Sequence, residues 1–115
     1  MPDLLPRPHI VLTSAGSADE GRRLARTLVE EGLAACVTIL LGAESIYRWK
    51  GRVETADEVV LLLKTTEEHV AALECRLKEL HSYETPEFLV LKVAGGSGEY
   101  LEWLKSSVGG LVDKG

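Results

Sequence analysis

Two short stretches of the chain gather the polar and aromatic side chains that could do chemistry. Ser45, Tyr47 and Trp49 alternate along a segment of strand-like composition, so their side chains share one face. The stretch around Pro86 supplies an imidazole, a phenol and two carboxylates, from His81, Tyr83, Glu84 and Glu87. Imidazole and carboxylate groups bind divalent metals, and aromatic rings are enriched at interfaces. These two stretches form the candidate site.

Several familiar motifs are absent. The sequence has no Gly-x-x-x-x-Gly-Lys-Ser/Thr loop and no Gly-x-Gly-x-x-Gly turn. The first strand pattern ends in Thr13-Ser14-Ala15-Gly16 rather than in Cys-x-x-Cys, so the ligands of a metallochaperone are missing. The strand pattern over 59–64 lacks the aromatic residues on which RNA bases stack. A net charge of −5 also argues against a nucleic-acid partner.

Composition points to the cytoplasm. No apolar run approaches the ~18 residues of a membrane span, and the N-terminal residues lack the apolar region of a signal peptide. The two cysteines, Cys36 and Cys75, do not suggest a disulfide framework. We therefore expect a cytoplasmic protein with no membrane partner.

Strand and helix patterns alternate along the chain. Strand patterns cover 9–13, 34–50, 59–65 and 88–93, the last as a core strand. Two helices begin at the capping boxes Ser17-x-x-Glu20 and Thr65-x-x-Glu68, the second with a buried stripe of Val70, Leu73, Leu77 and Leu80. A short third helix follows Ser97. This order predicts an α+β, ferredoxin-like β-α-β-β-α-β sandwich with a four-stranded antiparallel sheet. Residues 1–115 form one domain, with an arm at 1–7 and a frayed tail at 109–115.

The arm from Ala34 to Lys50 is the unusual element. It spans 17 residues, against the usual ~3–10 for a strand. Gly42 interrupts it, which predicts a bulge, and the Lys50-Gly51-Arg52 bend returns the chain. A strand of this length overhangs a small domain and needs a partner to pair with. We therefore expect the protein to act as an assembly rather than alone.

At this point the sequence resembles a known family. The resemblance rests on Ala34-Ala35-Cys36-Val37, Ser45-Ile46-Tyr47-Arg48-Trp49-Lys50-Gly51, Lys64-Thr65, Leu80-His81-Ser82-Tyr83-Glu84-Thr85-Pro86-Glu87 and Tyr100-Leu101-Glu102-Trp103. In order and spacing these segments are similar to the CutA divalent-cation tolerance family, over about residues 8–108. The resemblance implies a tight homotrimer built like the PII signalling proteins, linked to copper and other divalent ions and without established enzymatic activity. Ser82 stands where the family usually has proline.

The metal prediction centres on His81, in a cleft shared by two subunits. Glu84 and Glu87 complete the ligand set, and Cys36 favours Cu(I) where its sulfur reaches the cleft. So few ligands predict weak binding of Cu or another divalent cation, and no organic cofactor is expected. The simpler interpretations are that His81 caps a helix and that Cys36 is a small core residue.

A second set of residues is predicted to line the ligand cleft. It consists of Ser45, Tyr47, Trp49, Lys64, Tyr83 and Trp103. The aromatic members could equally be interface residues, and Lys64 a solvated strand end.

Two other functions compete with metal binding. One is a PII-like trimeric sensor that signals to a protein partner or binds an anionic small molecule, served by Lys64, Arg48, Lys50 and Arg52. The other is an acyl phosphatase, which needs an arginine in the loop after the first strand. The segment Thr13–Asp19 has none, so we expect no enzyme.

Overall fold

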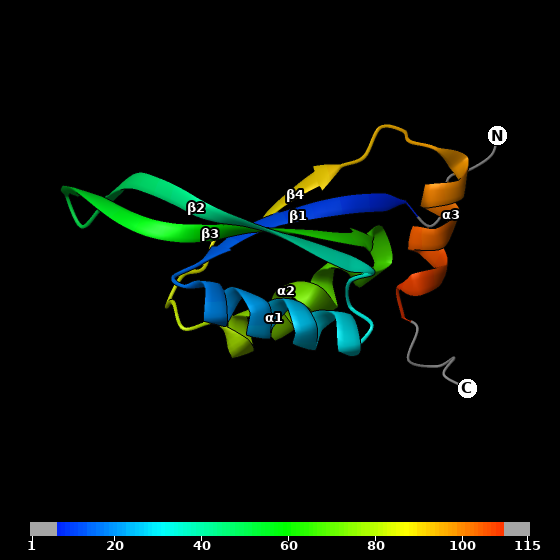
Figure 1. Cartoon of the computed structure of the whole chain (residues 1–115), viewed down its shortest axis with the longest axis horizontal. Coiled ribbons are helices and arrows are strands. Elements are labelled where there is room, and N and C mark those ends of the chain that lie inside the picture. The colour runs from blue at the N-terminus through cyan, green and yellow to red at the C-terminus, as the bar shows by residue number, and fades with distance from the viewer. Residues whose placement is uncertain (1–6, 110–115) are drawn as a thin grey trace.

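The computed structural model describes residues 7–109. In chain order the elements are β1 (Pro8–Ala15), α1 (Ala18–Glu30), β2 (Cys36–Trp49), β3 (Arg52–Thr66), a 3-10 turn (Glu67–His69), α2 (Val70–Leu80), β4 (Leu89–Lys92) and α3 (Gly98–Ser107). The sheet has the order β2-β3-β1-β4 with antiparallel neighbours, and α1 and α2 lie on one side of it (Figure 1). This confirms the predicted ferredoxin-like fold. Of the predicted arm and tail, only Arg7 and Gly109 fall within the described residues.

One face of the sheet forms the core with the two long helices. Side chains alternate along a strand, and the odd-numbered positions of β1 and β3 face α1 and α2. The largest fully buried apolar side chains of this core are Val11, Leu24, Leu28, Leu61, Leu63, Leu73 and Leu77. Each such side chain contributes about 1.5–3 kcal/mol through its removal from water. Of the predicted stripe of the second helix, Leu73 and Leu77 are buried as expected, whereas Val70 and Leu80 are half-buried.

The two predicted capping boxes have different outcomes. The Ser17 hydroxyl accepts the Glu20 amide N–H at 3.1 Å, and α1 is followed by Gly32 at a φ of 76°, as expected. The second box is wrong. β3 continues to Thr66, and the Thr65 hydroxyl instead donates to the Leu33 carbonyl at 2.9 Å. The hydroxyl of this threonine thus bonds to a backbone carbonyl far away in sequence rather than to an amide N–H of the following helix.

β4 differs from the predicted core strand. It has four residues, and all four side chains are exposed. β4 forms the edge of the sheet beside β1, with Leu91 opposite Ile10 on the face that the helices leave open. Its apolar side chains therefore form a surface that residues 7–109 leave uncovered.

The β2–β3 hairpin projects well beyond the helices (Figure 1), and the chain measures 48 × 31 × 23 Å. Its register shifts between Leu40 and Ala43, where Gly42 adopts a φ of 75°, so the predicted bulge is confirmed. Lys50 and Gly51 both have positive φ and close a two-residue turn. Through the bulge, even-numbered positions of β2 before Gly42 share a face with odd-numbered positions after it.

α3 lies across the end of the sheet, beside β1 and β3. It begins as predicted, because the Ser97 hydroxyl accepts the Tyr100 amide N–H at 3.2 Å. Leu104 anchors the helix and is 2% exposed.

Candidate functional site

A cavity of about 510 Å³ opens where the hairpin leaves the sheet, beside the loop that connects α2 and β4. The structure brings together four of the six residues predicted for the ligand cleft, together with the two predicted carboxylates. They are Ser45, Tyr47, Trp49, Tyr83, Glu84 and Glu87. Two segments that lie far apart in sequence therefore line one cavity, and its use as a ligand site stays a prediction.

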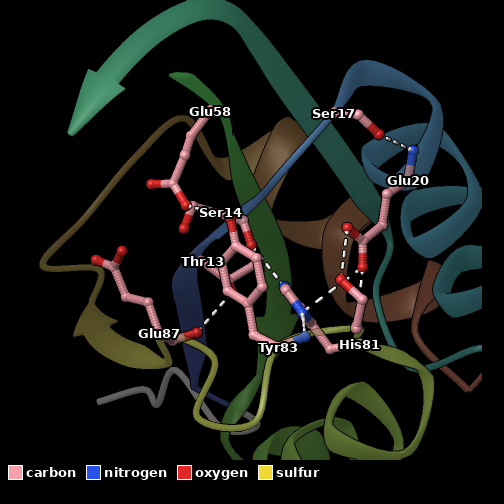
Figure 2. Close-up of polar contacts among 9 residues, drawn as sticks. Thr13, Ser14, Ser17, Glu20, Glu58, His81, Tyr83 and Glu87 are labelled. Carbon is pink, nitrogen blue, oxygen red and sulfur yellow. Dashed lines mark hydrogen bonds and ion pairs between the residues drawn. The ribbon is translucent and has the colours of Figure 1, made fainter. Parts of the chain in front are cut away.

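His81 holds the base of this site in place (Figure 2). It follows α2, and its side chain is fully buried. Its Nε2 lies 2.7 Å from the Ser14 carbonyl oxygen, and its Nδ1 accepts the Tyr83 amide N–H at 3.0 Å. A carbonyl only accepts and an amide N–H only donates, so this pattern requires the neutral tautomer with hydrogen on Nε2. Both ring nitrogens are thus occupied by the protein backbone.

Glu20 packs beside His81 and binds the same loop from α1. Its carboxylate accepts the Ser82 amide N–H at 2.9 Å and the Ser82 hydroxyl at 3.0 Å. Burial raises the pKa of Glu20, but the two hydrogen bonds from Ser82 outweigh burial and hold the pKa below its usual range. A proline at position 82 could supply neither donor. The departure from the family pattern at this position therefore has a structural use.

Tyr83 links the loop to the hairpin. Its hydroxyl donates to Glu58 Oε2 at 2.6 Å, and the Ser45 hydroxyl donates to Glu58 Oε1 at 2.7 Å. Burial and the carboxylate of Glu58 raise the pKa of Tyr83, so this phenol remains a donor. Gly16 leaves room for the ring, since a Cβ there would lie 3.2 Å from the Tyr83 hydroxyl oxygen.

Glu84 and Glu87 are placed differently from Glu58. The Thr13 hydroxyl donates to the Glu87 backbone carbonyl and fixes the end of the loop. Among the described residues, no hydrogen bond or ion pair holds the Glu84 or Glu87 carboxylate, and both residues line the cavity. These two acidic groups are available to a ligand.

The predicted residues Cys36, Lys64 and Trp103 lie elsewhere. Cys36 and Lys64 are paired across β2 and β3 on the open face of the sheet. Lys64 lies six residues along β3 from the cavity residue Glu58. There the Lys64 ammonium donates to the Thr38 hydroxyl at 2.7 Å and lies 3.6 Å from the Cys36 sulfur. Lys64 is therefore not a solvated strand end, and Cys36 is not a core residue.

Trp103 is on α3, where its ring lies 5.4 Å from that of Tyr100. The residues predicted to bind an anionic molecule are also divided. Arg48 and Arg52 flank the turn of the hairpin, and Lys64 lies near the other end of β3.

The predicted metal ligands do not converge within one subunit. Among the described residues, no group of three or more His, Cys, Asp or Glu side chains could hold a metal ion. A cation at His81 would have to displace the Ser14 carbonyl or the Tyr83 amide from the ring. The residues of this chain do not fit a copper centre built on His81, because a metal ligand needs a free lone pair.

Sequence reasoning missed Glu58 and Ser14, which also line the cavity. Glu58 is opposite Ala43 across the hairpin, on the same face as Ser45. Counting back from the turn at Lys50 and Gly51 would have placed Glu58 there, because the register between the turn and Ala43 is unbroken.

The sequence matches the CutA1 divalent ion tolerance protein family over residues 9–107. The chain belongs to the CutA family. It is 46% identical over 99 residues to a divalent-cation tolerance protein CutA of Pectobacterium atrosepticum, covering 86% of this chain and 90% of that one. It is also 46% identical over 101 residues to that of Thermus thermophilus, covering 88% and 98%. These relatives support a role in divalent-metal tolerance for this member of the family.

Solved CutA structures share the fold. Cut A1 from Thermus thermophilus superposes with a TM-score of 0.87 at 45% identity, covering 89% of this chain and 99% of that one. CutA1 from Oryza sativa also gives 0.87, at 41% identity, covering 89% and 94%.

Relatives of this CutA chain are described from more than one compartment. A rice relative is named chloroplastic; it is 43% identical over 98 residues, which cover 85% of this chain and 55% of that one. A structure from Archaeoglobus fulgidus is described as periplasmic, with a TM-score of 0.85 at 34% identity, covering 88% and 98%. A cytoplasmic location therefore stays a prediction. In the part of the chain that the structure describes, no helix has the length and apolar character needed to cross a membrane.

Proposed function

We propose that this protein is a homotrimer that acts in divalent-cation tolerance by binding a ligand, without catalysis, in the cavity at the base of each hairpin. The observation that carries the proposal is the exposed apolar surface on the hairpin and on the open face of the sheet. Leu40 is 48%, Ile46 69%, Val53 65% and Leu91 48% exposed. Leu40 and Leu91 lie on the open face of the sheet, whereas Ile46 and Val53 lie on the opposite face of the hairpin. Exposed apolar side chains on both faces are typical of a hairpin that partners cover.

The free edges of the sheet suggest how the subunits join. β3 pairs with β1 only from Val59 to Thr66, so its segment 52–58 has one unpaired side. β2 and β4 are the two edge strands of the sheet. Pairing between different edges of neighbouring subunits is heterologous and closes into a ring, which removes the unpaired edges. The number of three subunits comes from the resemblance to the CutA family, to which the chain belongs.

The cavity offers a divalent cation carboxylate ligands rather than the predicted histidine and cysteine. Copper or another divalent cation would find the carboxylates of Glu84 and Glu87 in the cavity, whereas His81 and Cys36 are engaged or distant. We infer weak divalent-cation contact at these two carboxylates, in line with the family role.

Light scattering on the full chain tests the assembly. We expect a mass of three subunits at micromolar concentration, since one chain is 12.5 kDa. Leu91→Glu places a charge on the open face and should release monomers. Val29→Glu is the matched control, because Val29 is a similarly exposed apolar residue on α1. A monomeric wild type, or equal behaviour of the two variants, would contradict the proposal.

A further inference from the structure

One ring nitrogen of His81 lies between two different partners (Figure 2). Its Nδ1 accepts the Tyr83 amide N–H at 3.0 Å, and the same Nδ1 lies 3.6 Å from Glu20 Oε2. The contact with the amide requires a lone pair on Nδ1, whereas a hydrogen bond to the Glu20 carboxylate requires a proton there. The two contacts therefore belong to two protonation states of one imidazole. Histidine is the side chain that changes its charge near neutral pH.

The groups around this ring can hold its charged form. Nε2 keeps its partner in both states, because the Ser14 carbonyl accepts its hydrogen whether the ring is neutral or charged. Glu20 approaches from α1, and hydrogen bonds from Ser82 hold the pKa of its carboxyl below the usual range. Glu20 is therefore negative wherever an imidazole titrates. From β3 the carboxylate of Glu58 adds a second negative charge, on the far side of the Tyr83 hydroxyl.

Protonation of the ring exchanges one hydrogen bond for another. A protonated Nδ1 has no lone pair, so the Tyr83 amide N–H loses its acceptor. The imidazolium gains the Glu20 carboxylate instead, and a hydrogen bond between charged partners is about twice as strong as a neutral one. The Tyr83 hydroxyl is bound to Glu58, so a shift of the Tyr83 backbone reaches the hairpin and the cavity wall.

We propose that His81 is a pH-sensitive switch, which holds the Tyr83 backbone when it is neutral and releases it to bind Glu20 when it is protonated. Acidification then loosens the loop after α2 at the point where Tyr83 ties it to the hairpin. The switch goes beyond the proposed function. It depends on neither the trimer nor a ligand, because every contact in it lies within one chain.

Nuclear magnetic resonance of the full chain between about pH 8 and about pH 5 tests the switch. The ring protons of His81 report its charge. Hydrogen exchange of the Tyr83 amide, corrected for the intrinsic effect of pH on exchange, reports its hydrogen bond. We expect protection of this amide to fall about tenfold as the ring becomes charged, the loss expected for one hydrogen bond. The Tyr100 amide is the control and should keep its protection, because its acceptor, the Ser97 hydroxyl, does not titrate.

A variant at Glu20 tests the exchange of partners. Glu20→Gln removes the negative charge beside the ring and keeps one side-chain oxygen for Ser82. The ring should then become charged at a lower pH than in the wild type, and the Tyr83 amide should stay protected down to that lower pH. Asp19→Asn is the matched control, because it removes an exposed carboxylate of the same helical turn; both transitions should stay where they are in the wild type.

Four results would overturn the switch. They are a Tyr83 amide that stays protected while the ring becomes charged, a ring that stays neutral down to about pH 5, equal loss of protection at Tyr100, and an unchanged transition in Glu20→Gln. Light scattering on the same samples separates this inference from the proposed function. A trimer without the transition refutes only the switch, and a monomer that shows the transition refutes only the assembly.

Discussion

Replacing His81 by alanine separates a structural histidine from a metal ligand. The substitution removes the donor to the Ser14 carbonyl and the acceptor of the Tyr83 amide, both at a fully buried ring. Each buried group left without a partner costs about 1–3 kcal/mol, which gives about 2–6 kcal/mol for the pair. Water entering from the adjoining cavity recovers part of this penalty. We therefore expect the free energy of unfolding to fall by about 2–4 kcal/mol.

Denaturant unfolding measures this loss at one fixed protein concentration, because the proposed assembly would make stability depend on concentration. His69→Ala is the matched control. His69 is half-buried and has one side-chain hydrogen bond, between its Nδ1 and the Thr66 hydroxyl at 2.9 Å. Its replacement should cost about 1 kcal/mol.

Titration with Cu(II) completes the experiment. The structure predicts equal isotherms for wild type and His81→Ala under conditions where both are folded, because the ring offers no free lone pair. A stability loss below about 1 kcal/mol, together with weaker Cu(II) binding in the variant, would refute the reasoning and restore His81 as the principal ligand.

Two further substitutions test the supports of the site. Glu20 has a pKa below its unfolded value, so the stability that its charge contributes is present above about pH 4.5 and is lost as the pH falls through the folded pKa. Unfolding midpoints should therefore show Glu20→Gln less stable than wild type at pH 7 and nearly as stable as wild type at pH 3. An equal stability difference at the two pH values contradicts this. Asp19→Asn is the control, because Asp19 is an exposed carboxylate of the same helical turn. Gly42→Ala should lose about 1–2 kcal/mol of unfolding free energy, because Gly42 has a φ of 75°. Gly95→Ala is the control and should change stability little, because a Cβ there has nothing within 4 Å and the φ is not positive. Equal losses in the two variants would show that a side chain does not strain the bulge.

Local signals predicted most of the fold. Ser17 and Gly32 bound the first helix through hydrogen bonds and backbone preferences that act within a few residues. The failure at Thr65 has a long-range cause, because its hydroxyl bonds to Leu33 across the sheet and no local pattern reports that contact.

Burial was harder to predict than element type. The apolar run at 88–93 predicts a strand correctly, but composition does not say whether the same chain or another one covers it. In the structure Leu89 and Leu91 are 55% and 48% exposed. A sequence of one subunit cannot distinguish a core strand from an interface strand, since both require apolar side chains.

The residues around the cavity were predicted where side-chain alternation or a place in the loop after α2 was enough. They were missed where the pairing register between β2 and β3 had to be known. Ser45, Tyr47 and Trp49 follow from period-2 alternation alone. Glu58 required the register that the turn at Lys50 and Gly51 sets between β2 and β3. Lys64 is excluded because it lies six residues farther along β3 than Glu58.

The contacts of the cavity explain why the overhanging hairpin matters to the site. Ser14 on β1 holds the His81 ring, His81 holds the Tyr83 backbone, and the Tyr83 hydroxyl holds Glu58 on β3. Glu58 in turn holds Ser45 on β2, so both strands of the hairpin are tied to the loop after α2. The hairpin beyond this point has only its own two strands, and such a pair is marginal in water. Subunit contacts that order the hairpin would therefore also fix Tyr47 and Trp49 in the cavity wall, and by linkage a ligand held there would favour the assembly.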